Sequence, residues 1–415
     1  MGIKSRGIKW SSLAFVLMLI AVDAYTSVVK SSTLYIFLIE KMRSEFYATS
    51  LISLQGIIAL SAPFLGLISD RVRSSCRRIL CPIIGLVLLL SGYLTFGLLV
   101  AGKPTSIQNI IGLPAAMIFI YLSIILVELS ALSVIVDEFP PYQRTPVVSM
   151  MTFTYLATAS VSFIANAYTL PVEALTAKHF LTPSIVSAVL IIAAVVARAS
   201  TRSKGERYRG VSHVSEIVRG LSKFKGLNEL YLSLFLAYVY FAAIVTGITP
   251  AIYESLHGVT ITSGHLIPTH IKFLAYATQI FFNVGGMAGA LSFNFLAKLI
   301  DYRKIPLGGL TLFATSFILG LILKSPTAGL ILATAAGFGW GAYIVFTVLY
   351  PAMVASKENP GVVYGLLILS YNLAYAVGPY IMFSLVTLTG TYLISYLLML
   401  AILAASVWVT ARILK

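Results

Sequence analysis

The chain has 415 residues, of which 59% are hydrophobic and only 10% are charged, and its mean hydropathy is +0.94. Soluble proteins carry about 25% charged residues, so this composition excludes a soluble globular protein and requires lipid as the solvent. The net charge of +15 does not indicate a nucleic-acid-binding protein, because the basic residues are confined to particular loops.

Long apolar runs recur along the chain, each near the ~20 residues that cross the hydrocarbon core of a bilayer. The runs are continuous and do not alternate with polar residues, which predicts transmembrane helices and not the strands of a barrel. The first run begins near Trp10 and is too long for the apolar part of a signal peptide, so we expect a retained first span. We expect twelve spans, at residues 10–39, 48–68, 79–101, 108–136, 146–168, 180–200, 227–254, 270–297, 305–323, 326–354, 361–388 and 390–413.

The distribution of lysine and arginine sets the expected orientation. With the N-terminus in the cytoplasm, most of the 29 basic residues fall on the cytoplasmic side, as the positive-inside rule requires. An even number of spans then places both termini in the cytoplasm of a multi-pass cell-membrane protein. We expect two six-helix bundles, at 1–200 and 227–415, joined by a basic linker at 201–226. Within it, 212–225 is either a lipid-binding interface helix or a plain connection.

The two halves carry a related motif. After the second span the chain reads Gly-Leu-Ile-Ser-Asp-Arg-Val-Arg from Gly66, and after the eighth it reads Ala-Lys-Leu-Ile-Asp-Tyr-Arg-Lys from Ala297. The first segment resembles the signature between spans 2 and 3 of the major facilitator superfamily of secondary transporters. A second segment, Asp-Glu-Phe-Pro-Pro-Tyr-Gln-Arg from Asp137 after the fourth span, is similar to the family's pattern of an acidic residue, proline and arginine. A looser counterpart begins at Glu358. The chain departs from the signature at Arg73, where the family has glycine.

The resemblance implies an all-α membrane protein with twelve helices in two pseudo-symmetric bundles. It also implies that the charged loops act as a gate on the cytoplasmic side, where an aspartate at a helix end pairs with arginine or with a helix N-terminus. A plainer interpretation is that these charges only set the topology. The candidate gating residues are Asp70, Arg71, Arg77, Arg78, Asp137, Arg144, Asp301 and Arg303.

Three ionisable residues lie far from the ends of the spans: Asp23, Lys30 and Glu128. A charge at the bilayer centre costs about 2.5–3.5 kcal/mol on insertion scales, so these residues are functional candidates, although a structural ion pair is the alternative. Polar and aromatic residues at helical spacing on other spans extend the candidate substrate site. We expect that site to contain Lys30, Tyr121, Asn283, Tyr343, Tyr350, Tyr371 and Asn372.

A finer resemblance lies on the first span, where Lys-Ser-Ser-Thr-Leu-Tyr-Ile-Phe from Lys30 is similar to a pattern of monocarboxylate transporters. In that family the lysine contacts the substrate carboxylate and takes part in proton coupling. The chain departs from the family on the eighth span, where Gly289 and Phe293 stand near the expected Asp and Arg. Glu128 is the candidate that supplies the missing carboxylate.

These observations predict a transporter, not an enzyme, that moves a small organic anion, such as the monocarboxylate lactate, together with protons. Lys30 would bind the carboxylate, and Asp23 or Glu128 would exchange the proton. We expect a monomer in the lipid bilayer, with no nucleic-acid partner, no cofactor and no metal. One alternative is a proton-coupled exporter of cationic or amphipathic compounds, attracted by Asp23 and Glu128. A second is a non-transporting membrane sensor on the same fold.

Overall fold

The structure is a computed structural model that describes residues 9–29, 45–76, 78–101, 106–169, 178–199, 226–258, 269–354 and 359–413. The described residues are almost entirely helical, with no strand among them. The helices are α1 (Trp10–Val28), α3 (Glu45–Ala59), α4 (Ala62–Cys76), α5 (Leu80–Ala101), α6 (Ser106–Glu138), α7 (Pro141–Thr169), α8 (Lys178–Ala199), α10 (Leu227–His257), α11 (Thr269–Leu299), α12 (Ile305–Ile322), α13 (Pro326–Val354), α14 (Pro360–Thr389) and α15 (Tyr392–Ile413).

Every expected span contains described helix. Ten of the described helices are long and apolar enough to cross a membrane. The second expected span is α3 followed by α4, a pair bent by 42°, and the ninth is α12, whose apolar stretch Ile305–Gly320 is shorter. The all-helical membrane fold class is therefore confirmed, and the twelve-span count is compatible with these helices. The later part of the first expected span, 30–39, and the linker at 201–225 lie outside the described residues.

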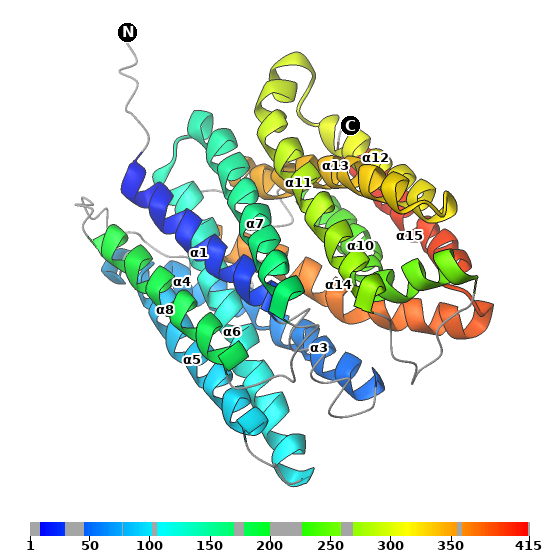
Figure 1. The fold of residues 1–415 in the computed structure, drawn as a ribbon. Coiled ribbons are helices and arrows are strands. Elements are labelled where there is room, and N and C mark those ends of the chain that lie inside the picture. The colour runs from blue at the N-terminus through cyan, green and yellow to red at the C-terminus, as the bar shows by residue number, and fades with distance from the viewer. Residues whose placement is uncertain are drawn as a thin grey trace.

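The helices lie in two groups, side by side in Figure 1. We call α1–α8 the N-terminal half and α10–α15 the C-terminal half. The two halves meet where α3 and α4 pack against α14, and where α7 packs against α11. One end of the bundle, where α1 begins and α4, α6, α13 and α15 end, holds most of the described arginines, and we call it the basic end. The opposite end is called the far end.

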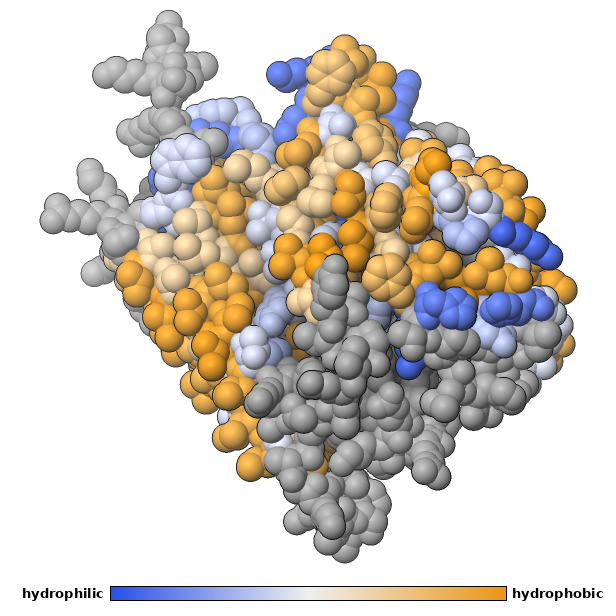
Figure 2. All heavy atoms as spheres, in the orientation of Figure 1, coloured by the Kyte–Doolittle hydropathy of each residue, from blue (hydrophilic) through white to orange (hydrophobic). Residues whose placement is uncertain are grey.

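Large hydrophobic side chains cover the outer surface of the bundle. Figure 2 shows them over much of the visible helix flanks, while hydrophilic residues lie mainly near the helix ends. Leu94 and Leu98 on α5 are each 65% exposed, and Val161 on α7 is 67% exposed. Large apolar side chains exposed along so many helices are typical of lipid contact.

Small residues allow α11 and α13 to pack backbone against backbone. A Cβ atom added at Gly285 would overlap the carbonyl oxygen of Thr334, and one added at Gly337 would overlap that of Phe282. Close approach through glycine is a common basis of helix association in membranes, where water cannot drive helices together. The interior of the C-terminal half therefore depends on this glycine seam.

Replacing Gly285 by alanine should destabilise the protein by about 3 kcal/mol, because the added methyl group must push the two helix backbones apart. Gly308, on the exposed side of α12, is a matched control, since a Cβ there would meet nothing within 4 Å. Its replacement by alanine should be neutral or stabilise by up to ~1 kcal/mol. Thermal unfolding of the purified variants in detergent measures both effects. Equal melting temperatures for the Gly285 and Gly308 variants would contradict the close packing.

Candidate functional site

Arg78 at the basic end ties together three segments of the N-terminal half. Its guanidinium donates from Nη2 to Asp70 Oδ1 at 2.6 Å, from Nε to Asp137 Oδ2 at 3.1 Å, and from Nη1 to Ser69 Oγ at 2.6 Å. The side chain has no exposed surface. The backbone of Arg78 adopts a left-handed conformation with φ 63° in the short turn between α4 and α5. This turn directs the side chain back among the helices.

The ionisation of Arg78 follows from its neighbours. Burial alone would lower the pKa of the guanidinium, but the carboxylates of Asp137 and Asp70 outweigh burial and raise that pKa above its ordinary value. Arg78 therefore remains charged at every physiological pH. A buried cation held by two carboxylates is stable only while all three groups stay together.

Asp70 also joins the two halves of the molecule. Its carboxylate accepts hydrogen bonds from the backbone N–H groups of Gly361 (Oδ1, 3.0 Å) and Val362 (Oδ2, 3.2 Å), in the first turn of α14. A carboxylate at this position satisfies free N–H groups and interacts favourably with the helix dipole. The contact needs small residues, because a Cβ at Gly66 would overlap the backbone of Gly361.

Arg144, near the start of α7, makes the complementary contact. Its side chain donates to the carbonyl oxygens of Phe139 at 3.0 Å and Val136 at 3.3 Å, and also to that of Ala352 near the end of α13. A cation at a helix C-terminus is favourable for the same reason as an anion at an N-terminus. The N-terminal half thus holds one end of α14 and one end of α13. We call Asp70, Arg78, Asp137 and Arg144 the basic-end clamp.

The remaining candidate gating residues lie elsewhere. Asp301, the sequence counterpart of Asp70, accepts a hydrogen bond from the backbone of Arg303 at 3.0 Å within its own exposed turn. Arg71 is exposed on α4, and Arg77 lies outside the described residues. The two related aspartates therefore have different surroundings, and only Asp70 reaches the other half in a described contact.

A buried carboxylate joins the halves near the middle of the bundle. Glu128 on α6 accepts a hydrogen bond from the hydroxyl of Tyr371 on α14. Asp23 on α1 is 6% exposed and accepts a weak hydrogen bond from Ser27 Oγ at 3.4 Å. Tyr155 on α7 lies within electrostatic reach of both carboxylates. Helices α1, α6, α7 and α14 thus converge on the two acidic groups.

Aromatic rings from the C-terminal half face this acidic pair. The ring of Tyr238 lies 5.3 Å from that of Tyr371, 5.8 Å from that of Tyr375 and 5.0 Å from that of Trp340. Trp340 in turn stacks on Phe241 at 4.5 Å. We call Asp23, Ser27, Glu128, Tyr155, Tyr238, Tyr371 and Tyr375 the central site. It combines acidic groups of one half with aromatic rings of the other.

A second polar contact between the halves involves Gln55, whose amide nitrogen donates to the side-chain oxygen of Asn372. Asn372 Nδ2 in turn donates to the carbonyl oxygen of Ile368 at 2.9 Å. Sequence reasoning singled out neither Gln55 nor Tyr155. The signal for Gln55 and Tyr155 in the sequence is a polar side chain within an expected span, and many other positions share that feature.

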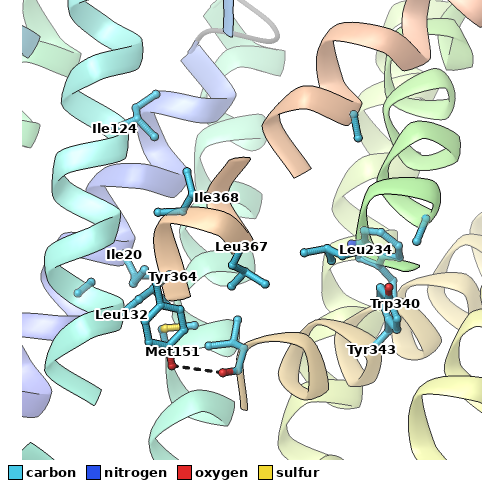
Figure 3. Close-up of a cluster of buried hydrophobic side chains, with 14 of the residues drawn as sticks. Ile20, Ile124, Leu132, Met151, Leu234, Trp340, Tyr343, Tyr364, Leu367 and Ile368 are labelled. Carbon is cyan, nitrogen blue, oxygen red and sulfur yellow. Dashed lines mark hydrogen bonds between the residues drawn. The ribbon is translucent and has the colours of Figure 1, made fainter. Parts of the chain in front are cut away.

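The structure separates several predicted substrate-binding residues from the central site. Tyr343 is buried within the C-terminal half, 3.2 Å from Ser233 Oγ, and Tyr350 lies towards the basic end with its ring 5.5 Å from that of Phe346. Figure 3 shows Tyr343 beside Trp340, apart from Tyr364, which lies close to Leu132 and Met151 of the N-terminal half.

Tyr121 is 2% exposed on α6. Asn283 is buried on α11, and its Nδ2 has no hydrogen-bond partner among the described residues. Lys30 lies outside the described residues. Of the predicted polar residues, the structure brings together Asp23, Glu128 and Tyr371. No group of three or more His, Cys, Asp or Glu among the described residues is placed to hold a metal ion.

Comparison with known proteins addresses the fold. No family model matches the chain, and no curated protein sequence matches it. Among solved structures, the chain is similar to the human organic anion transporter MFSD10 (TETRAN), with a TM-score of 0.74 at 13% identity, over 98% of this chain and 100% of that one. The chain has the major facilitator superfamily fold.

The major facilitator fold gives the two sites a common setting. The basic-end clamp and the central site both lie where the two halves of that fold meet, on helices α1, α4, α6, α7, α10, α13 and α14. The general resemblance that the sequence motifs predicted is therefore confirmed at the level of the fold. The narrower resemblance to monocarboxylate transporters stays a prediction.

Proposed function

We propose that the chain is a secondary active transporter that moves a small organic anion together with protons by alternating access. The observation that carries this proposal is the buried bond between Glu128 and Tyr371, which joins the two halves beside a second buried carboxylate, Asp23. Alternating access requires the halves to rock around a central site, so a titratable contact across their interface couples protonation to that motion.

Protonation of Glu128 removes a negative charge from the closed interface between the two halves. An anionic carboxylate is expensive at the bilayer centre, whereas a protonated one is not. The proton also converts Glu128 from an acceptor only into a group that can donate, so its bond with the hydroxyl of Tyr371 rearranges. Proton exchange at Glu128 or Asp23 thereby biases the two halves between open and closed arrangements.

The basic-end clamp is the gate in this proposal. The bonds of Asp70 (α4) to the start of α14 and of Arg144 (α7) to the end of α13 hold the basic end closed, and opening of that end requires both contacts to break. The lysine and arginine distribution favours a cytoplasmic position for this end, in a monomeric protein of the cell membrane with both termini in the cytoplasm. While the basic end is closed, the central site can open only towards the outside of the cell.

Lys30 is the proposed anion-binding charge. It follows Ser27 by three residues and Asp23 by seven, the spacing of one helical face. The solved structure of similar fold is described as an organic anion transporter. An anionic substrate would compete with the neighbouring carboxylates for the lysine and so link substrate binding to proton exchange.

Replacing Lys30 by alanine should therefore reduce acid-driven uptake of labelled lactate on the order of 100-fold, because the substrate carboxylate loses its charged partner in a low-dielectric site. Lys272→Ala, near the start of α11, is a matched control because it removes a lysine that is not part of the proposed site. Uptake is measured in proteoliposomes with an inward proton gradient. Unchanged uptake by the Lys30 variant would remove the role that we give to this residue.

One observation favours a second candidate, the transport of a cationic or amphipathic compound against protons. The described part of the central site contains two carboxylates and the rings of Tyr238, Tyr371 and Tyr375. Carboxylates and aromatic faces attract organic cations. A quaternary ammonium compound that is transported, while lactate and other monocarboxylates are not, would select this candidate.

A further inference from the structure

Tyr155 on α7 lies beside both buried carboxylates of the central site. Its hydroxyl is within hydrogen-bonding reach of Ser27 and within electrostatic reach of Asp23 and Glu128. Ser27 Oγ donates to Asp23 Oδ1 at 3.4 Å, one helical turn earlier on α1. A hydroxyl can both donate and accept a hydrogen bond, so a row of groups able to pass a proton runs from Asp23 through Ser27 to Tyr155 and on towards Glu128.

All four residues of this row belong to the N-terminal half. Asp23 and Ser27 are on α1, Tyr155 is on α7 and Glu128 is on α6. Helix α1 packs against both α6 and α7, and the three helices lie together in Figure 1. Motion of one half relative to the other therefore leaves the row intact.

Tyr371 stands in a different relation to Glu128. It bonds to this carboxylate from α14, in the C-terminal half, so the bond breaks when the halves separate at that point. Glu128 is 9% exposed, and a carboxylate so buried needs another partner or a proton once Tyr371 withdraws. Tyr155 offers a hydroxyl from the same half as Glu128.

Asp23 and Glu128 share one buried site, so ionising both at once is costly and the pair favours holding a single proton. From the C-terminal half, the hydroxyls of Tyr371 and Tyr375 on α14 and of Tyr238 on α10 face this pair. A proton held by one carboxylate at a time needs a path to the other, and the hydroxyl row supplies that path.

We propose that Tyr155, with Ser27, relays one proton between Glu128 and Asp23. Protonated Glu128 gives its proton to the oxygen of Tyr155, the hydroxyl proton of Tyr155 passes to Ser27, and that of Ser27 passes to Asp23. One O–H bond is broken at Glu128 and one is formed at Asp23, while both hydroxyls are neutral before and after. The negative charge moves the other way, from Asp23 to Glu128. This inference rests on the proposed transport function and assigns its proton to the pair of carboxylates.

Tyr155→Phe tests the relay, because it keeps the ring and removes the hydroxyl. In proteoliposomes, uptake of labelled lactate driven by an inward proton gradient should fall about tenfold. Exchange of labelled for unlabelled lactate at equal concentrations and equal pH should stay within about twofold of wild type, because exchange moves no net proton. Equal losses of gradient-driven uptake and of exchange would indicate a merely structural role and overturn the relay.

Two further variants sharpen the test. Tyr240→Phe is the matched control, since it removes a buried hydroxyl that has no hydrogen-bond partner among the described residues, and it should leave both rates unchanged. Ser27→Ala interrupts the same row next to Asp23 and should reproduce the effect of Tyr155→Phe. The double variant of Ser27 and Tyr155 should be no slower than the slower single variant, because both residues serve one path. Losses that multiply in the double variant would overturn the shared path.

Monodisperse elution and an unchanged melting temperature confirm that each variant is folded. If Tyr155→Phe does not fold, Ser27→Ala carries the test by the same comparison of uptake with exchange. A wild-type chain that couples lactate to protons, with variants that couple equally well, would overturn the relay alone. A wild-type chain without acid-driven uptake would overturn the transport proposal and the relay with it.

Discussion

Glu128→Gln should reduce proton-driven uptake on the order of 100-fold while leaving the protein folded and inserted. Glutamine keeps the shape of the side chain and can still accept a hydrogen bond from Tyr371, but it cannot exchange a proton. The variant should therefore bind substrate yet respond little to a proton gradient. Uptake with and without the gradient, measured at equal amounts of reconstituted protein, gives both quantities.

Two variants control this experiment. Glu229→Gln removes a carboxylate in the first turn of α10 at the basic end, away from the central site, and should retain gradient-dependent uptake. Asp23→Asn tests the second buried carboxylate. If Glu128→Gln keeps its response to the gradient and Asp23→Asn loses it, Asp23 exchanges the proton. If both keep the response, the central site does not couple protons.

The second large effect concerns the basic end. Arg78→Gln should destabilise the protein by about 3–5 kcal/mol, because the carboxylates of Asp70 and Asp137 lose the cation that holds them in a buried position. Asp70 should then leave the N-terminus of α14, so the basic end should open more often. Thermal unfolding measures the first consequence, and spin–spin distances between labels at the exposed positions 142 and 299 measure the second.

Arg71→Gln is the matched control for Arg78. Arg71 belongs to the same sequence motif but is exposed, so its replacement should change stability by no more than ~0.5 kcal/mol and leave the distance distribution unchanged. Similar melting temperatures for the two arginine variants would show that the buried clamp does not hold the basic end closed.

Hydrophobic patterning predicts the spans well because each must match the thickness of a bilayer. It does not predict the break in the second span. The bend falls at Leu60–Ser61, just before Pro63. In a continuous helix the ring of Pro63 would clash with the carbonyl group of Ala59. At the break the carbonyl oxygen of Ile58 accepts hydrogen bonds from the backbone N–H of Ser61 at 2.9 Å and from Ser61 Oγ at 2.6 Å. The position of a proline in the sequence does not show whether it kinks a helix or ends it.

The motif around Asp70 predicts a charged gate, but the geometry depends on the fold. Arg77 and Arg78 are equivalent in the motif, and the left-handed backbone of Arg78 is what brings its side chain to Asp70. The internal repeat suggested that Asp301 mirrors Asp70. A helix N-terminus from the other half lies beside Asp70, whereas Asp301 bonds within its own turn. Related sequences do not guarantee related partners.

The central site could be predicted only in part, because its contacts cross between the halves. The cost of burying charge singled out Asp23 and Glu128 from the sequence. Tyr371 was a candidate as well, but nothing in the sequence pairs it with Glu128 across 243 positions. Tyr343 followed the same helical spacing as Trp340, yet it turns into the C-terminal half towards Ser233. A periodic stripe shows which residues share a face and not which neighbour that face meets.

The most direct test of proton-coupled anion transport is the pH inside proteoliposomes, reported by an entrapped dye, when lactate is added outside without any imposed gradient. The proposed transport predicts that the interior acidifies faster than in protein-free vesicles, since each anion enters with protons, and that Glu128→Gln removes the difference. Acidification no faster than in protein-free vesicles, for lactate and every other monocarboxylate supplied to correctly inserted protein, would contradict it.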